Sequence, residues 1–286
     1  MLFILLAILV LPLTIKINQN EYTGDSYENI LETFGSGTNE IISIEVIEGD
    51  FPVNSLSTEY VKLTTLTVPK ECFDGAIDDK LFQNMDSIKT VTIDGATSIG
   101  SNSFENCQQL ESIHFSSCTQ IYFNAFNLCK SLATVTIPLL QIIGNYGFSS
   151  TSLTSVNFDQ LTQIGDYSFS DCSLLSVFDA PMLSSIGSYC FKSTALISIQ
   201  FEHLAMINNQ GHSFESCSKL EVVHLNNVET LETFLFKDCT SLNTITGTKI
   251  TTIKDSCFSG CIKLSTITFP SLVTIGDNAF SGIETI

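Results

Sequence analysis

The 286-residue sequence predicts a repeat solenoid: a right-handed horseshoe with a parallel β-sheet of about eleven short strands on its concave side, and short turns, 3-10 or extended segments on its convex side. The first observation that predicts it is a phenylalanine that recurs every 21 to 23 residues. A period of this length indicates stacked structural repeats, here called coils, each of which contacts only its neighbours. The register phenylalanines are Phe82, Phe104, Phe126, Phe148, Phe169, Phe191, Phe214, Phe236, Phe258 and Phe280.

The second observation is a short segment in each coil with the alternation of a half-buried strand. The coil from Phe126 reads FNLCKSLATVTIPLLQIIGNYGF, and its strand segment has the form L-x-x-[IV]-x-[IF]. One such strand per coil, always in the same sense, stacks into a parallel sheet with neighbours ~4.8 Å apart. The expected strands end near Val46, Val68, Ile93, Phe115, Ile137, Phe158, Ala180, Phe201, Leu225, Gly247 and Phe269.

The third observation is an Ile-Gly pair that recurs in the second half of the coil. Glycine tolerates positive φ, so these pairs predict the tight turns that return the chain to the next strand. The residue before each register phenylalanine is mostly small, as close approach of adjacent coils requires. The pairs are Ile99-Gly100, Ile143-Gly144, Ile164-Gly165, Ile186-Gly187 and Ile275-Gly276.

The repeated pattern F-x-x-C-x-x-L-x-x-I-x-[IF]-P-x-L-x-x-I-G-x-x-x-F resembles the BspA-like leucine-rich repeat family, the Treponema-type repeat. The resemblance covers roughly Ile41 to Ile286. It implies a leucine-rich-repeat horseshoe, and a secreted or cell-surface protein of a kind often implicated in adhesion to host or matrix proteins. A fold by itself does not fix a function, so this implication stays an expectation.

The chain is expected to divide into a signal peptide over residues 1–17, a leader or cap over 18–40, and the repeat array over 41–286, with its C-terminal cap absent or truncated. The apolar run from Leu2 to Leu13 is too short to span a bilayer and suits the core of a signal peptide. No Lys or Arg precedes the run and no A-x-A site follows it. A buried first element that caps the array is therefore the alternative.

The composition excludes some classes of partner. The formal net charge is -18, from 12 basic and 30 acidic residues. This charge disfavours nucleic acid and anionic membrane surfaces. We expect a monomer without direct membrane insertion, whose partner is a protein or glycoprotein ligand such as a host or matrix surface.

Ten cysteines raise the question of disulfides, and the repeat argues against them. Six of them share one slot, three residues after a register phenylalanine, and Thr151, Thr194 and Met85 occupy that slot in other coils. A slot that accepts Cys, Thr or Met indicates a small buried site filled by free thiols. Bridges between adjacent coils, such as Cys217 to Cys239, remain the alternative. The six are Cys107, Cys129, Cys172, Cys217, Cys239 and Cys261.

The sequence contains no recognisable catalytic motif, so we expect no enzyme and no cofactor. No metal site is expected either. Cys257 and Cys261 form a C-x-x-x-C pair at ordinary repeat positions, without a second pair at zinc spacing. Asp74, Asp78 and Asp79 lie in an irregular loop without EF-hand spacing.

The residues that flank the buried position of each strand predict the ligand-binding surface. When the coils are aligned, the same exposed strand position is mostly Thr, which suits exposed strand positions. In the middle of the array other polar residues replace Thr at this position. There it reads Asn157, Asp179, Gln200 and His224, with Asp159 and Glu202 at the edge. Asn and Asp are depleted in strands, so packing explains these residues poorly. The coils after Phe148 and Phe191 also lose one residue each before the strand, and the coil ending at Phe214 gains two in INNQGHSF.

The favoured function is a non-enzymatic surface or secreted binding protein that engages a macromolecule through the concave face. An intracellular interaction scaffold with the same fold, cytoplasmic in location, is the alternative. It is favoured by the thiol-rich interior and by the lack of any N-x-[ST] glycosylation acceptor. A remoter alternative is an ice- or water-ordering surface, because T-x-T pairs such as Thr65/Thr67 and Thr134/Thr136 recur.

Overall fold

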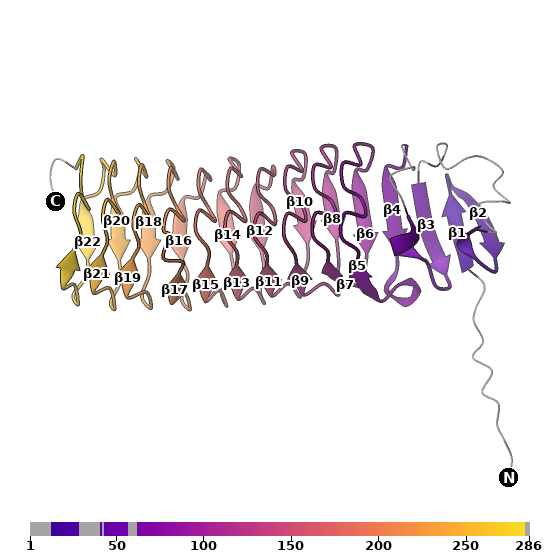
Figure 1. Ribbon diagram of the computed structural model, residues 1–286, viewed down its shortest axis with the longest axis horizontal. Helices are drawn as coiled ribbons and strands as arrows, with labels where there is room; N and C mark the ends of the chain where they lie inside the picture. The colour runs from indigo at the N-terminus through magenta and orange to yellow at the C-terminus, as the bar shows by residue number, and fades with distance from the viewer. Residues whose placement is uncertain (1–12, 29–40, 42, 57–61, 284–286) are drawn as a thin grey trace, which may run out of the picture.

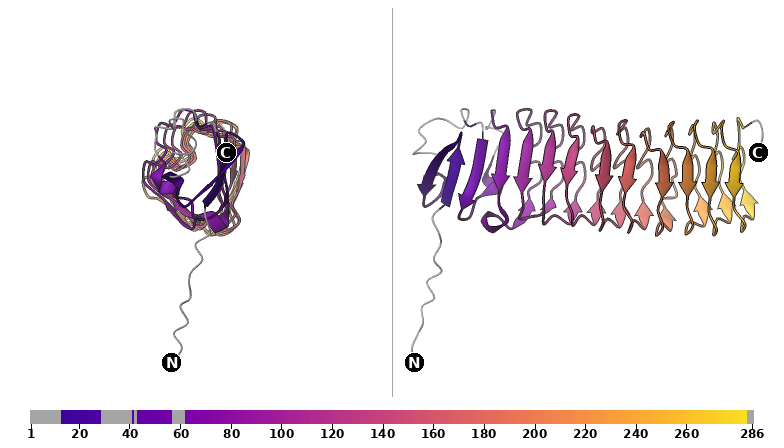
Figure 2. Two further views of the ribbon diagram at one scale, coloured as in Figure 1. Left: turned by 90° about the vertical axis from the view of Figure 1, so that its right-hand side faces the viewer. Right: turned by 180° about the vertical axis from the view of Figure 1, so that it is seen from behind.

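The computed structural model describes residues 13–28, 41, 43–56 and 62–283, and it shows a solenoid of stacked coils (Figure 1). The coils form a nearly straight row and almost superimpose when viewed end-on, so the curvature is slight (Figure 2). Strands dominate the described residues. Helix there is limited to residues Tyr27 and Glu28 and to short 3-10 turns at Val53–Ser55 and Lys70–Cys72.

The main column of strands runs the length of the array and confirms the predicted parallel strands. Every pairing between two strands of this column is parallel. Within the described residues the column contains β3 (Ser43–Glu48), β4 (Thr65–Val68), β6 (Thr90–Ile93), β8 (Ser112–His114), β10 (Thr134–Thr136), β12 (Ser155–Asn157), β14 (Val177–Asp179), β16 (Ser198–Gln200), β18 (Val222–His224), β20 (Thr244–Thr246) and β22 (Thr266–Thr268).

A second column of parallel strands lies where the sequence predicted turns or extended segments. It forms one sheet from β5 to β17 and another from β19 to β23. The missing pairing between β17 and β19 coincides with the segment INNQGHSF, which lengthens its coil. Its members are β5 (Gly75–Ile77), β7 (Ala96–Ile99), β9 (Gln120–Ile121), β11 (Ile142–Ile143), β13 (Gln163–Ile164), β15 (Ser185–Ile186), β17 (Met206–Ile207), β19 (Thr230–Leu231), β21 (Thr252–Ile253) and β23 (Thr274–Ile275).

The glycine of each Ile-Gly pair follows a strand of this second column. These glycines do not have positive φ, which corrects the reason given above for their presence. Glycine is needed because of close approach: a Cβ on Gly187 would collide with the backbone at Asp166 of the preceding coil, and one on Gly144 would lie 2.9 Å from the carbonyl carbon of Tyr122.

The N-terminal end of the main column is closed by an antiparallel hairpin. Strand β1 (Leu13–Ile17) pairs with β2 (Asn20–Gly24) on one side and with β3 on the other. Residues 1–12 and 29–40, which hold most of the expected signal peptide and leader, lie outside the described residues. A cleavage at residue 17 would remove a strand whose apolar side chains are buried, so a cleaved leader would have to end before Leu13 for β1 to remain.

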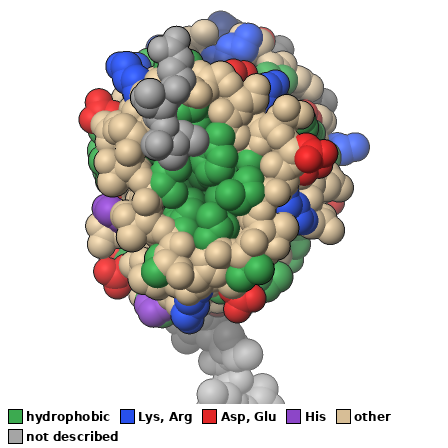
Figure 3. Space-filling model, turned by 90° about the vertical axis from the view of Figure 1, so that its left-hand side faces the viewer, with side chains coloured by type: hydrophobic (Ala, Val, Ile, Leu, Met, Phe, Trp, Pro, Cys, Tyr) green, Lys and Arg blue, Asp and Glu red, His purple; other side chains and the backbone are tan. Residues whose placement is uncertain are grey.

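The core is a stack of phenylalanine rings that runs through the array. Successive rings from Phe82 to Phe280 are stacked with centroids 4.8–5.6 Å apart. The register phenylalanines are fully buried except Phe280, which is partly covered in the last coil. Hydrophobic side chains gather at that end of the array (Figure 3). Val273 and Ile275, near the end of the described chain, are exposed.

All ten cysteines are buried free thiols, as the repeat predicted. In most coils the slot cysteine donates a hydrogen bond to the register phenylalanine carbonyl of the preceding coil, for example Cys107 Sγ to Phe82 O at 3.0 Å. The same bond recurs from Cys129, Cys172, Cys217, Cys239 and Cys261. The thiol column therefore ties each of these coils to its predecessor.

We predict that Phe169→Ala lowers the free energy of unfolding by about 3–5 kcal/mol, as the loss of a buried aromatic ring does. Phe169 is fully buried, and its ring stacks on those of Phe148 and Phe191. Denaturant unfolding measures the change, and Leu174→Ala in the same coil is the control because Leu174 is 54% exposed. Similar losses in the two variants would contradict the burial of the ring column.

We also predict that stability falls above pH 9, because burial raises the pKa of the Cys107 thiol from 9.0 to about 12. Between these values the unfolded chain loses the thiol proton and the folded chain keeps it. Each such thiol therefore lowers the free energy of unfolding by up to about 1.4 kcal/mol per pH unit.

The measurement is denaturant unfolding against pH for the native chain and for Cys107→Ala, which removes one titrating thiol and should show a shallower decline. Thiol titration of the unfolded, unreduced chain checks that all ten cysteines are free. Parallel pH profiles for the two proteins would contradict the assignment.

Candidate functional site

The structure places the six predicted site residues along the middle of the main column. Asn157 and Asp179 are direct neighbours on β12 and β14, and Gln200 and His224 are direct neighbours on β16 and β18. Asp159 and Glu202 follow the ends of β12 and β16. All are exposed except His224, which is half-buried.

The main column is interrupted twice in this stretch. It divides into a sheet that ends at β10, a pair β12–β14, and a sheet that begins at β16. Strands β12 and β16 belong to the two coils that are one residue short. In the first of these coils Leu153 stands two residues after the slot residue Thr151, whereas in the preceding coil Leu132 stands three residues after Cys129. Thr194 and Leu196 repeat the short spacing. Each break therefore lies on the N-terminal side of the strand of a shortened coil.

The two slot threonines explain why these junctions are also weaker in the interior. Thr151 Oγ1 donates to Phe148 O of its own coil at 2.9 Å, and Thr194 Oγ1 donates to Phe191 O at 2.9 Å. A slot cysteine instead donates to the preceding coil. At the two breaks the described residues therefore lack both the strand pairing and the slot hydrogen bond. The ring stack and the second column still join the coils there.

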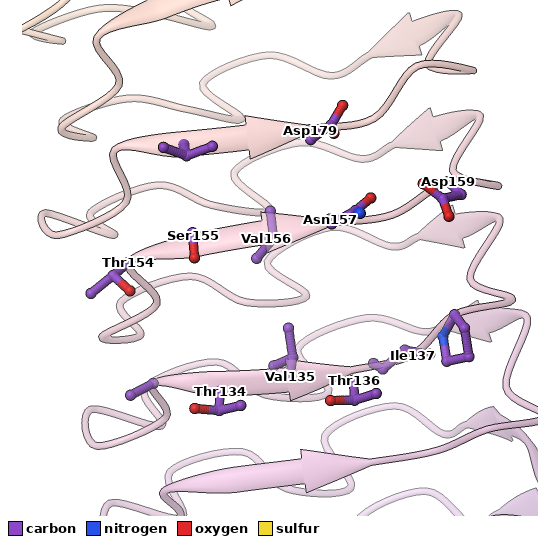
Figure 4. Close-up of a pocket in the computed structure, with 13 residues that line it drawn as sticks. Thr134, Val135, Thr136, Ile137, Thr154, Ser155, Val156, Asn157, Asp159 and Asp179 are labelled. Carbon is purple, nitrogen blue, oxygen red and sulfur yellow. The ribbon is translucent and has the colours of Figure 1, made fainter.

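A hollow opens at the first break, between β10 and β12 (Figure 4). Its volume is about 630 Å³. Thr134, Val135 and Thr136 stand on one strand and Ser155, Val156 and Asn157 on the next, with Asp159 beyond the strand end and Asp179 on the strand above (Figure 4). The apolar part of the lining is completed by Ala133, Ile137, Pro138 and Val177. We call it the first hollow.

The second hollow opens at the second break, between β14 and β16, and has a volume of about 610 Å³. Its apolar lining includes Val177, Phe178, Pro181 and Ile197, of which Val177 is 54% and Ile197 48% exposed. Its polar lining includes Asp179, Gln200 and Glu202. Asp179 and Val177 line both hollows, so the two are adjacent.

Five of the six predicted residues therefore line one or both hollows, and His224 does not. His224 Nδ1 lies 2.7 Å from Thr246 Oγ1, so its ring is held by the neighbouring strand. Among the residues that the structure describes, none forms an ion pair with Asp159, Asp179 or Glu202, and neither hollow is lined by Lys or Arg. Both hollows are open, negatively charged and partly apolar.

Sequence reasoning missed a second aromatic column on a different edge of the coil. Tyr146, Tyr167, Tyr189, His212 and Phe234 each stand two residues before a register phenylalanine, and that spacing was the signal that could have revealed them. Neighbouring rings stack with centroids 4.4–4.8 Å apart. All five have positive φ, a backbone conformation that bulky residues seldom adopt, so the ring contacts compensate for the strain.

The ion pairs beside this aromatic column also join successive coils. Glu215 accepts hydrogen bonds from His212 at 2.9 Å and from Lys237 at 3.3 Å, and Lys192 lies 3.2 Å away. Burial alone would raise the pKa of Glu215, but these partners hold it below the usual value. The irregular segment INNQGHSF thus brings His212 into a structural network.

The described residues contain no group of three or more His, Cys, Asp or Glu side chains placed to hold a metal ion. Across the same parts of the chain, no helix is long and apolar enough to cross a membrane.

We predict that lengthening the short coil closes the first hollow. The variant carries Thr151→Cys with one lysine inserted before Ser152, which reproduces the Cys129-Lys130-Ser131-Leu132 spacing of the preceding coil. Strands β10 and β12 should then pair, giving NMR contacts between residues 134–136 and 155–157. Thr151→Cys alone is the matched control, because the coil stays short. Unpaired strands in the lengthened variant would show that coil length does not cause the break.

Comparisons with known proteins give solved structures of similar repeat proteins. A leucine-rich repeat protein from Bacteroides ovatus is 20% identical over 86% of this chain and 90% of its own, with a TM-score of 0.32. A leucine rich cell surface protein from Faecalibacterium prausnitzii is 21% identical over the same shares, with a TM-score of 0.40. The T. pallidum leucine rich repeat protein is 20% identical over 78% of this chain and 84% of its own, with a TM-score of 0.37.

Among curated proteins, none matches the chain. The family described as BspA type leucine rich repeat region matches residues 54–176 and 162–286, in six copies. These matches span most of the repeat array and agree with the coil pattern that the register phenylalanines define. The chain therefore belongs to the BspA type leucine rich repeat family.

Proposed function

We propose that this protein is a non-enzymatic binding module that engages a protein or glycoprotein partner through the main column, at β10 to β18. The observation that carries the proposal is the pair of hollows where the main column separates. Apolar side chains such as Val177 and Ile197 are exposed there, beside carboxylates that form no ion pair within the described part of the chain. Exposed apolar groups rimmed by polar ones are typical of interaction sites.

The charge of this surface sets the chemistry of the partner. Asp159 and Asp179 line the first hollow, Asp179 and Glu202 line the second, and within the described chain no basic residue lines either one. The partner surface is therefore basic, and association is faster at low salt because opposite charges steer the encounter. An enzyme is not proposed, since no described His, Cys or Lys lines either hollow.

Location at the cell surface or outside the cell is part of the proposal. It rests on the family resemblance and on the apolar run from Leu2 to Leu13. The second candidate, an intracellular scaffold, is favoured by one observation: ten buried cysteines are all free. Fractionation of the producing cells into medium, surface and cytosol separates the two, because only the first candidate places the protein outside.

We predict that Asp179→Ala together with His224→Ala weakens partner binding at least tenfold, since it removes one charge and one hydrogen-bonding ring from the face. A partner is first captured on the intact chain from matrix or cell-surface extracts, then purified and titrated against each variant. Asp179→Asn, which keeps the shape and removes only the charge, should account for most of the loss and for the salt dependence.

The control is Glu229→Ala, an exposed acid ahead of β19 and outside both hollows. Melting curves check that the fold persists, because His224→Ala also removes the contact with Thr246. Undiminished affinity in the double variant would overturn the proposed face.

A further inference from the structure

We propose that the two hollows are two copies of one site, and that together they take two basic side chains from an extended segment of the partner. The inference rests on the proposed function and specifies it: the partner carries Arg or Lys at positions three residues apart.

The hollows are equivalent because their linings are related by a constant shift of 43 residues, which is two coils. Pro138 in the first hollow corresponds to Pro181 in the second, and Thr154 corresponds to Ile197. The same shift relates the slot threonines Thr151 and Thr194, which stand in the two short coils. The further corresponding pairs are Val135 and Phe178, Thr136 and Asp179, Ser155 and Ser198, Asn157 and Gln200, and Asp159 and Glu202.

Each copy offers the same combination of groups. An amide, Asn157 or Gln200, is followed two residues later by a carboxylate, Asp159 or Glu202, on the strand that borders the break. An apolar wall faces them, formed by Val135 in the first hollow and Phe178 in the second. Arg and Lys side chains match this arrangement, because their aliphatic stems cover apolar surface while the cationic head reaches a carboxylate.

The spacing of the copies limits the partner. Neighbouring strands lie ~4.8 Å apart, so sites two coils apart are separated by about 10 Å along the array. A segment in the extended polyproline II conformation advances ~3.1 Å per residue and completes a turn every three residues, so side chains three residues apart lie on one face, about 9 Å from each other. Asp179 stands on the strand between the two sites and lines both. The segment therefore runs along the array axis, across the strands, with its two basic side chains flanking Asp179.

The test uses synthetic Gly/Ser peptides that carry one arginine, or two arginines separated by one, two, three or six residues. The intact chain is labelled with nitrogen-15, and NMR titration at about 50 mM and about 300 mM salt gives the affinities, including weak ones. The peptide with two intervening residues should bind about tenfold more tightly than the one-arginine peptide, because the second contact is intramolecular.

The variants assign each arginine to a hollow. Asp159→Asn and Glu202→Gln should each reduce the affinity of the best two-arginine peptide to that of the one-arginine peptide. Glu229→Gln, an acid of the same charge outside the hollows, should leave it unchanged. Shifted amide signals should belong to β10, β12, β14 and β16.

Three results would overturn the paired site. The first is an affinity that does not depend on the spacing of the two arginines, and the second is highest affinity at six intervening residues, which a helical segment would give. The third is an affinity that Asp159→Asn and Glu202→Gln leave unchanged. The proposed function fails separately. If the peptides do not bind but the captured partner still requires Asp179, the paired site is wrong and the binding face stands. If the Asp179 variants also bind the captured partner with unchanged affinity, both proposals are wrong.

Discussion

The whole architecture depends on the contact between each register phenylalanine and the next. Rings at centroid distances of 4.8–5.6 Å fix where one coil lies on another. In six coils the slot cysteine adds a hydrogen bond to the phenylalanine carbonyl of the preceding coil, such as Cys129 to Phe104 at 3.0 Å. With the coils held at this point, the two strand columns on either side of it can pair only in one register. Burial in this core also raises the pKa of the thiols of Cys107 and Cys261 to about 12.

The same contact explains how the candidate site arises. A coil that loses one residue cannot slide along its neighbour, because its phenylalanine is already stacked. The segment between the slot residue and the strand is instead one residue shorter. The strand of that coil therefore separates from the strand of the preceding coil. Thr151 and Thr194 mark the coils where this happens, and each has lost the slot bond to the preceding coil. A change inside the core therefore produces a hollow on the surface.

Much of this could be predicted from the sequence, since the ring column, the main strands and the free thiols follow from a strict repeat. The second column could not, because segments such as Ile142–Ile143 are two residues long and their Ile-Gly pairs also suit turns. The candidate residues were predicted as one surface because Asn157 and Asp179 are unusual in strands, but the two hollows that five of them line were not predicted. The hollows depend on how far β12 separates from β10, and β16 from β14. His224 was predicted for its chemistry, and its contact with Thr246 becomes visible only in three dimensions.

The most direct test of the account is hydrogen exchange in the unmodified chain, followed amide by amide. Intact pairing at β8–β10 and β18–β20 should give slow exchange in those strands. The amides of β12 that face β10, and those of β16 that face β14, should exchange much faster, because no strand covers them. Uniform protection along the main column would contradict the claim that the shortened coils open the sheet and form the site.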